Sequence, residues 1–163
     1  MPITPLHFGP GVLFHSAAPP RVSFLAFVAA NGITDVESIY NVLAGNFPVH
    51  RFLHTFVGAA LVTGVTVALF MSSRRFAQSV ELPNWFQWQQ LPLAAVIVGA
   101  ALGAFSHIVL DGIMHADMRP LAPWSAANPF LHIVSLSTLH LACIISAFAG
   151  ALICLKTKPG LLR

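Results

Sequence analysis

Long apolar segments, separated by short polar stretches, dominate the pattern along the chain. Four of these segments are long enough to cross a membrane as helices, because roughly 20 apolar residues span the hydrocarbon core. They occupy residues 22–44, 50–70, 91–115 and 130–155. A shorter apolar run over residues 6–18 contains Gly9-Pro10-Gly11, which favours an irregular start followed by a short helix. The pattern predicts an all-α membrane bundle of about four long transmembrane helices plus a short N-terminal helix or re-entrant segment.

The composition favours a membrane location and a single domain. Hydrophobic residues make up 56% of the 163 residues, charged residues make up 8%, and the mean hydropathy is +0.78. A soluble domain carries roughly 25% charged residues, so this chain cannot cover a water-facing surface. We expect one membrane-embedded domain over residues 1–163. Its expected partner is a membrane lipid or a lipid-linked substrate, with neither a nucleic acid nor an obligatory protein partner.

The basic residues predict the orientation of the bundle. Six of them fall at one end of the predicted arrangement: Arg21, Arg74, Arg75, Lys156, Lys158 and Arg163. Lys and Arg are enriched on the cytoplasmic side of membrane proteins. We therefore expect this end to be cytoplasmic; in a bacterial inner membrane the opposite end, with the two remaining basic residues Arg51 and Arg119, would be periplasmic.

Histidine and aspartate recur every four residues near the end of the segment over residues 91–115. His107, Asp111 and His115 therefore share one face of a helix. Such a polar stripe in apolar surroundings is costly unless its groups are paired or hold an ion. The spacing predicts a polar site inside the bundle.

Two earlier segments bring further polar residues to the same depth. Two segments of roughly 20 Å, joined by a tight turn at Pro19-Pro20, would bring His7 and Asp35 to the same depth. His50 and His54 open the next segment and fall at the same end. The sequence thus predicts one site built from four segments.

Imidazole and carboxylate groups in this arrangement are typical ligands of Zn²⁺ and of other divalent first-row ions. The candidate ligands are His7, Asp35, His50, His107 and Asp111, with His54 and His115 as added ligands or proton carriers. Taken singly, His50 and His54 also suit an interfacial helix start, and Asp111 suits a structural pair with a histidine. The grouping of all seven favours a site for one or two ions, with zinc as the expected metal.

Two arginines and two carboxylates near the predicted site indicate substrate chemistry. Arg51 and Arg119 favour an anionic substrate, because guanidinium binds phosphate bidentately. Snorkelling to the membrane interface is the alternative for both. A carboxylate not bound to metal, Glu37 or Asp117, would suit a general base, with His54 as a proton carrier.

Four stretches resemble the YdjM-type inner-membrane, metal-dependent hydrolases: Ile3-Thr4-Pro5-Leu6-His7-Phe8-Gly9-Pro10-Gly11, Ile33-Thr34-Asp35-Val36-Glu37, His50-Arg51-Phe52-Leu53-His54-Thr55 and Ser106-His107-Ile108-Val109-Leu110-Asp111. Their order, His…Asp…His…His-x3-Asp, is also similar to the zinc-dependent phospholipase C and single-strand nuclease group. The resemblance implies a two-zinc core of His7, Asp35, His50, His107 and Asp111, with Asp111 bridging the ions. It does not extend to that group's third zinc, because Leu136 stands four residues after His132 and cannot ligate a metal.

These observations predict a membrane-bound, metal-dependent hydrolase that cleaves a lipid phosphoester at the periplasmic membrane face with a metal-activated water. A metal-dependent lipid amidase or esterase would use the same ligands without needing the arginines. A metal or proton carrier is the alternative from another class, and its ligands should continue through the whole membrane depth. A non-enzymatic regulator with a structural metal would instead have a saturated site.

Overall fold

A computed structural model describes residues 5–157 of the chain except residues 78, 81 and 83. Over these residues the structure is 71% helical and has no strand, which confirms the all-α prediction. The elements in chain order are η1 (Pro5–His7), α1 (Phe8–Ala17), α2 (Phe24–Leu43), η2 (Phe52–His54), α3 (Phe56–Ala77), η3 (Trp85–Gln90), α4 (Leu93–Met114) and α5 (Leu136–Thr157). Four of the helices are long and α1 is short, as expected, but in the described part of the chain three of the four, and not α2, are apolar enough to be candidate membrane spans.

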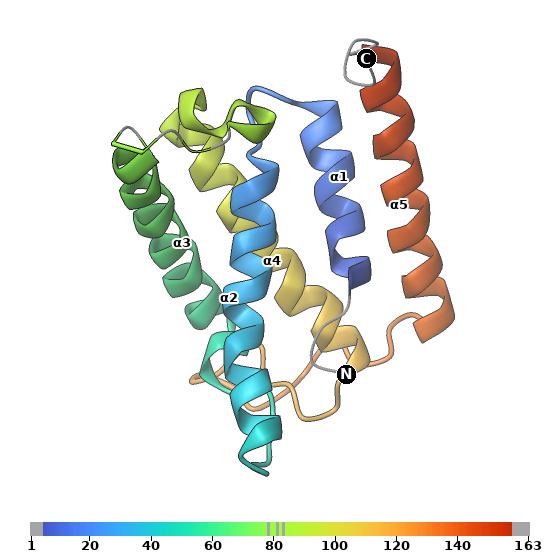
Figure 1. Cartoon of the computed structure of the whole chain (residues 1–163). Coiled ribbons are helices and arrows are strands. Elements are labelled where there is room, and N and C mark those ends of the chain that lie inside the picture. Colours follow the sequence, from blue (N-terminus) through green and yellow to red (C-terminus); the bar gives the residue numbers. More distant parts are fainter. Residues whose placement is uncertain (1–4, 78, 81, 83, 158–163) are drawn as a thin grey trace.

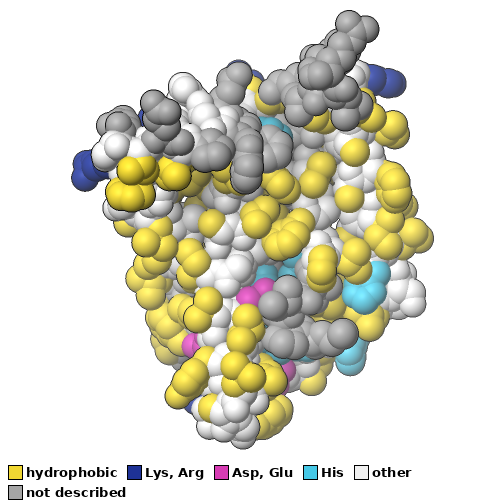
Figure 2. Space-filling view, viewed as in Figure 1, with side chains coloured by type: hydrophobic (Ala, Val, Ile, Leu, Met, Phe, Trp, Pro, Cys, Tyr) yellow, Lys and Arg dark blue, Asp and Glu magenta, His cyan; other side chains and the backbone are white. Residues whose placement is uncertain are grey.

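Three helices are long and apolar enough to cross a membrane. They are Phe56–Ala77 in α3, Leu93–Met114 in α4 and Leu136–Lys156 in α5. Their exposed faces carry large apolar side chains such as Leu69, Leu141 and Phe148, and Figure 2 shows a surface dominated by hydrophobic side chains. Because water would not solvate such faces, the helices favour association with a membrane.

Small residues allow α2 and α4 to pack closely. Gly99 and Gly103, four residues apart on α4, lie so near α2 that a Cβ atom on either would collide with a backbone carbonyl oxygen. The oxygens belong to Ser23 and Phe27. Rows of small residues at this spacing bring membrane helices into close contact. This contact holds the first turn of α2 against the middle of α4, and further along the same pair Asn31 and Asp35 of α2 meet His107 of α4.

Helices α1 and α5 form the other side of the bundle. These two helices touch at Gly9 and Gly150. A Cβ atom added to Gly9 would collide with the backbone of Cys143, and one added to Gly150 would lie 2.7 Å from the backbone nitrogen of Leu13. In Figure 1, α1 lies between α5 and the α2–α4 pair. Residue His7, just before α1, is thereby carried toward the end of α4.

Helices that follow one another in the chain run antiparallel, so that their termini separate into two ends (Figure 1). Helices α1, α3 and α5 end at one end, where Arg74 and Arg75 close α3 and Lys156 lies in the last turn of α5. Arg21, between α1 and α2, lies at that end too, whereas Lys158 and Arg163 lie outside the described residues. We call this the basic end; η1, η2 and the end of α4 lie toward the opposite one.

The segment expected as a helix over residues 50–70 begins later and ends later than predicted. Residues 50 and 51 lie in a turn, residues 52–54 form η2, and α3 starts at Phe56. The Thr55 hydroxyl accepts a hydrogen bond from the backbone N–H of Gly58 (2.9 Å), which is the pattern of a helix N-cap. Because α3 begins only after this cap, His50 and His54 lie outside the helix. The apolar pattern of the sequence does not show where the cap falls.

Candidate metal centre

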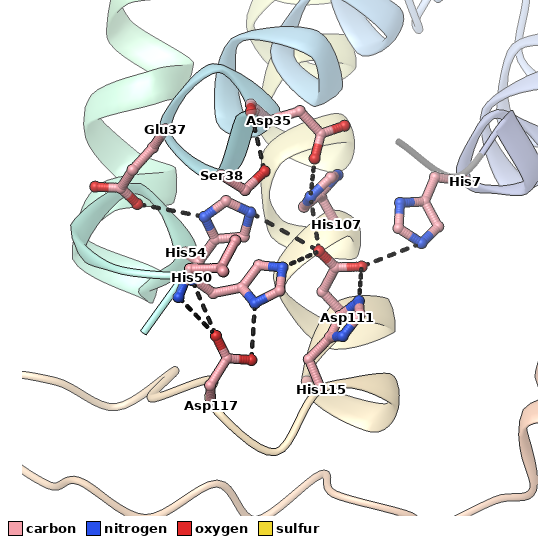
Figure 3. A network of polar contacts seen from close by, with 12 residues as sticks. His7, Asp35, Glu37, Ser38, His50, His54, His107, Asp111, His115 and Asp117 are labelled. Carbon is pink, nitrogen blue, oxygen red and sulfur yellow. Dashed lines mark hydrogen bonds and ion pairs between the residues drawn. The ribbon is translucent and has the colours of Figure 1, made fainter. Parts of the chain in front are cut away.

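The Asp111 carboxylate lies at the centre of a ring of histidines (Figure 3). Its side chain is 5% exposed and projects from the last turns of α4. Around it lie five Nε2 atoms, each within 3.9 Å of a carboxylate oxygen: those of His107 (3.2 Å), His7 (3.4 Å), His54 (3.8 Å), His50 (3.9 Å) and His115 (3.9 Å). The arrangement gathers nitrogen donors around one buried carboxylate.

These histidines come from four separate parts of the fold. His7 ends η1, His50 lies in the turn before η2 and His54 ends η2. His107 lies in α4, and His115 directly follows it. The structure therefore brings together the histidines that the sequence nominated as ligands, including the two nominated as added ligands.

Asp35 joins the cluster from α2. Its Oδ1 atom lies 3.4 Å from His107 Nε2. Ligand atoms of Asp35, His54, His107 and Asp111 all lie within 4.8 Å of one another, which makes a four-residue group that could hold a metal ion. His7 is not part of this group.

A second group shares one member with the first. Ligand atoms of His50, Asp111 and His115 also lie within 4.8 Å of one another. Asp111 thus belongs to both groups, one with four residues and one with three. A carboxylate has two oxygens, so it can serve two ions at once.

The residues present fit a bound cation. Four buried Nε2 atoms, those of His7, His54, His107 and His115, have no hydrogen-bond partner among the described residues. Buried polar atoms without partners are costly and rare in folded proteins. Their common direction, toward Asp111, is the arrangement that a divalent ion would satisfy.

Asp117 holds His50 from behind. The Nδ1 atom of His50 donates to Asp117 Oδ1 at 2.9 Å, and the backbone N–H groups of Val49 and His50 donate to Oδ2. Burial opposes ionisation of Asp117, but the hydrogen bonds from the His50 ring and from the backbone N–H groups of His50 and Val49, together with the charge of His50, outweigh it and lower the pKa of that carboxyl. A carboxylate behind a histidine fixes the tautomer and leaves Nε2 free to ligate a metal.

Glu37 supports His54 in the same way. Its Oε2 atom accepts hydrogen bonds from the backbone N–H groups of Arg51 (3.1 Å) and Leu53 (2.9 Å). The Nδ1 atom of His54 lies 3.4 Å from the same oxygen. Glu37 and Asp117 therefore lie behind the histidines, on the side away from Asp111 (Figure 3).

Asn31 gives His107 its support, and the sequence reasoning missed it. The Asn31 amide donates from Nδ2 to Phe27 O (2.9 Å), which directs its Oδ1 atom toward His107 Nδ1 at 3.0 Å. His107 Nδ1 is therefore the donor and Nε2 the free nitrogen. The sequence does contain one indication of this role: Asn31 stands four residues before Asp35, so the two side chains share one face of an apolar helix.

Burial keeps two of the histidines neutral. Desolvation lowers the pKa of His7 to about 4, although the nearby Asp111 opposes the shift. Desolvation also lowers the pKa of His54, against its hydrogen bond with Glu37. Both rings lie outside the three candidate spans and are neutral near pH 7, and neutral imidazole is the form that ligates a metal.

Arg51 and Arg119 line one pocket of about 400 Å³ beside the cluster. His50 lines it too, and the Nε2 atom of this ring lies 3.9 Å from an oxygen of Asp111. The two arginines nominated for substrate binding thus lie together and next to a candidate metal ligand.

Comparisons with protein-family models, with curated proteins and with solved structures found no match. The resemblance to the YdjM-type hydrolases therefore stays a prediction, and the argument for function rests on the geometry of the cluster.

Proposed function

We propose that the chain is a membrane-embedded, metal-dependent hydrolase. One observation carries the proposal: the unpartnered Nε2 atoms of buried histidines converge on the carboxylate of Asp111. Zn²⁺ is the ion that we propose, because a mixed set of imidazole and carboxylate donors suits it best among the common divalent ions. Metal analysis would distinguish it from other first-row ions.

The sizes of the two ligand groups favour catalysis over a purely structural role. The group of Asp35, His54, His107 and Asp111 has the four ligands of a closed zinc site. The group of His50, Asp111 and His115 has three, as in catalytic zinc sites that keep one position open. This second group lies beside the pocket through His50. We assign hydrolysis to this three-residue group; His7 faces Asp111 at 3.4 Å but belongs to neither group.

The roles of the other residues follow from their contacts. When bound, the ion supplies a water nucleophile at neutral pH and polarises the oxygen of the bond to be cleaved. Glu37, Asp117 and Asn31 fix the ring orientations of His54, His50 and His107, respectively. The hydrogen bonds that occupy Glu37 and Asp117 lead us to replace the general-base role expected from the sequence with a positioning role.

We assign the protein to a bacterial inner membrane with the metal centre toward the periplasm. The basic end carries Arg21, Arg74, Arg75 and Lys156, and cytoplasmic loops are rich in such residues. The cluster is confined to the opposite half of the bundle, which suits a site at a membrane face. A carrier would need ligands through the full depth of the bundle.

Hydrolysis that depends on zinc is the direct test. Purified protein is stripped with a chelator, reloaded with zinc, and assayed with chromogenic phosphoesters, carboxylic esters and amides. Cleavage of one class that disappears on chelation and returns with zinc supports the proposal. A zinc-loaded protein that cleaves none of them, while moving zinc or protons across proteoliposome membranes, would assign it to the carriers.

A further inference from the structure

The pocket beside the metal centre has mixed walls. Its volume is about 400 Å³, and we call it the arginine pocket. Its lining includes Arg51, Arg119, His50, Phe52 and Val57. Cations and a metal-facing histidine thus share one cavity with apolar side chains.

The charged part of this lining is entirely basic. Arg51 and Arg119 contribute guanidinium groups, and none of the described residues that line the pocket carries a carboxylate. Within the described part of the chain neither arginine forms an ion pair; Arg51 donates from Nε to the carbonyl oxygen of Pro48 (3.0 Å). Both arginines lie away from the basic end, so the enrichment of Lys and Arg on the cytoplasmic side of a membrane does not explain their position. Two uncompensated guanidinium groups in one cavity fit a phosphate.

The apolar part of the lining leads toward the membrane. Val57 belongs to the first turn of α3, which is a candidate membrane span. Phe52, in η2, lines the pocket and is 51% exposed. A hydrocarbon chain attached to a bound phosphate would therefore pass over these side chains into lipid.

We propose that the arginine pocket binds the phosphate group of a phosphate-ester lipid, with Arg51 and Arg119 on the phosphate oxygens and the hydrocarbon chain along Phe52 and Val57. This deepens the proposed function, on which it rests, by naming the substrate class of the same site. In the hydrolysis of a phosphomonoester lipid, a water oxygen bonds to phosphorus and the bond from phosphorus to the lipid oxygen breaks. One water proton ends on the lipid alcohol, and the other stays on the released hydrogen phosphate.

Binding of a matched set of probes tests this inference on zinc-loaded protein in a neutral maltoside detergent. Decylphosphonate carries both headgroup and chain, and its phosphorus–carbon bond is not an ester. Methylphosphonate lacks the chain, and decanol lacks the headgroup. We expect decylphosphonate to bind at least tenfold more tightly than either, and to lose about tenfold in affinity for each arginine replaced in Arg51→Gln and Arg119→Gln.

A matched pair of charge changes controls for non-specific electrostatics. The double variant Arg21→Gln with Arg75→Gln removes the same charge from the basic end, and its affinity should equal that of the wild type. An affinity for decylphosphonate equal to that of the wild type in the double variant Arg51→Gln, Arg119→Gln would overturn the inference. Binding of methylphosphonate as tightly as decylphosphonate would also overturn it, because the ligand would then be a free phosphate. Zinc content is measured on the same samples, so that loss of the metal centre is distinguished from loss of the pocket.

Discussion

His107 and Asp111 lie one turn apart on α4 and face each other, with 3.2 Å between His107 Nε2 and Asp111 Oδ2. The opposite nitrogen of the same ring is held by Asn31 from α2 at 3.0 Å. The ring is therefore held from behind through Nδ1, and Nε2 is left facing the carboxylate of Asp111. Such preorganisation is what a tight metal site needs, because little order remains to be created on binding.

Asn31→Leu tests this support directly. The variant removes the acceptor for His107 Nδ1, and we expect zinc affinity to fall about 10- to 100-fold, the usual effect of losing a partner behind a metal ligand. Asn31→Asp keeps an acceptor oxygen and should bind zinc at least half as tightly as the wild type. Competition with a fluorescent chelator gives the affinities. Asn46→Leu, on the loop after α2, is the control; equal losses in both leucine variants would contradict the role of Asn31.

Glu37 distinguishes positioning from general-base catalysis. Glu37→Ala leaves the backbone N–H groups of Arg51 and Leu53 without their acceptor and frees His54, so zinc affinity should fall at least tenfold. Glu37→Gln keeps one acceptor oxygen, so its zinc affinity should fall less. Zinc titration and kcat are measured on both variants. Normal zinc affinity with lost turnover in Glu37→Gln would restore the general-base role and remove the positioning one.

The close packing of α2 on α4 should be sensitive to a single methyl group. A Cβ at Gly103 would collide with the backbone of Phe27, so Gly103→Ala should cost about 1–3 kcal/mol of stability and weaken zinc binding. Gly64 on α3 has nothing within 4 Å of an added Cβ, and Gly64→Ala should leave the melting temperature equal or higher. Thermal unfolding in detergent compares the two; an unaffected Gly103→Ala would show that α2 and α4 are not held this closely.

The metal-free protein should lose stability as the pH falls from about 6.5 to 4. Burial lowers the pKa of His7 to about 4, whereas an unfolded histidine has its ordinary value of 6.5. Over this window the unfolded chain takes up a proton at His7 that the folded chain does not, so lower pH favours unfolding. His7→Gln should reduce the slope of melting temperature against pH in the presence of a chelator.

The matched control for this slope is His140→Gln on α5, which removes a histidine outside the cluster. It should keep the slope of the wild type. A slope unchanged by His7→Gln would mean that His7 is not buried against Asp111 in the metal-free protein.

Much of the fold followed from the sequence because apolar segments reveal membrane helices by length alone. The spacing of His107, Asp111 and His115 also predicted a shared face, and Asp111 indeed lies between the other two. The turn at Pro19-Pro20 correctly suggested that His7 and Asp35 lie near one site. These inferences needed only local geometry.

Other features depend on contacts between segments and were not predictable in this way. The start of α3 at Phe56 depends on the cap at Thr55, which an apolar pattern hides. The roles of Asp117 and Asn31 depend on which nitrogen of His50 or His107 they meet, and only packing decides that. A sequence lists ionisable groups, but it does not say which of them face the ion and which stand behind the ligands.

The most direct test of the metal centre is the zinc content of purified protein after loading and dialysis. Wild type, Asp111→Ala, Asp111→Asn and the control His140→Gln are compared by elemental analysis, with folding checked by circular dichroism and size-exclusion chromatography. We expect about one to two zinc ions per chain in the wild type and the control, and close to none in folded Asp111 variants. A wild type that retains no zinc, or Asp111 variants that retain as much as the wild type, would contradict a metal centre built around Asp111.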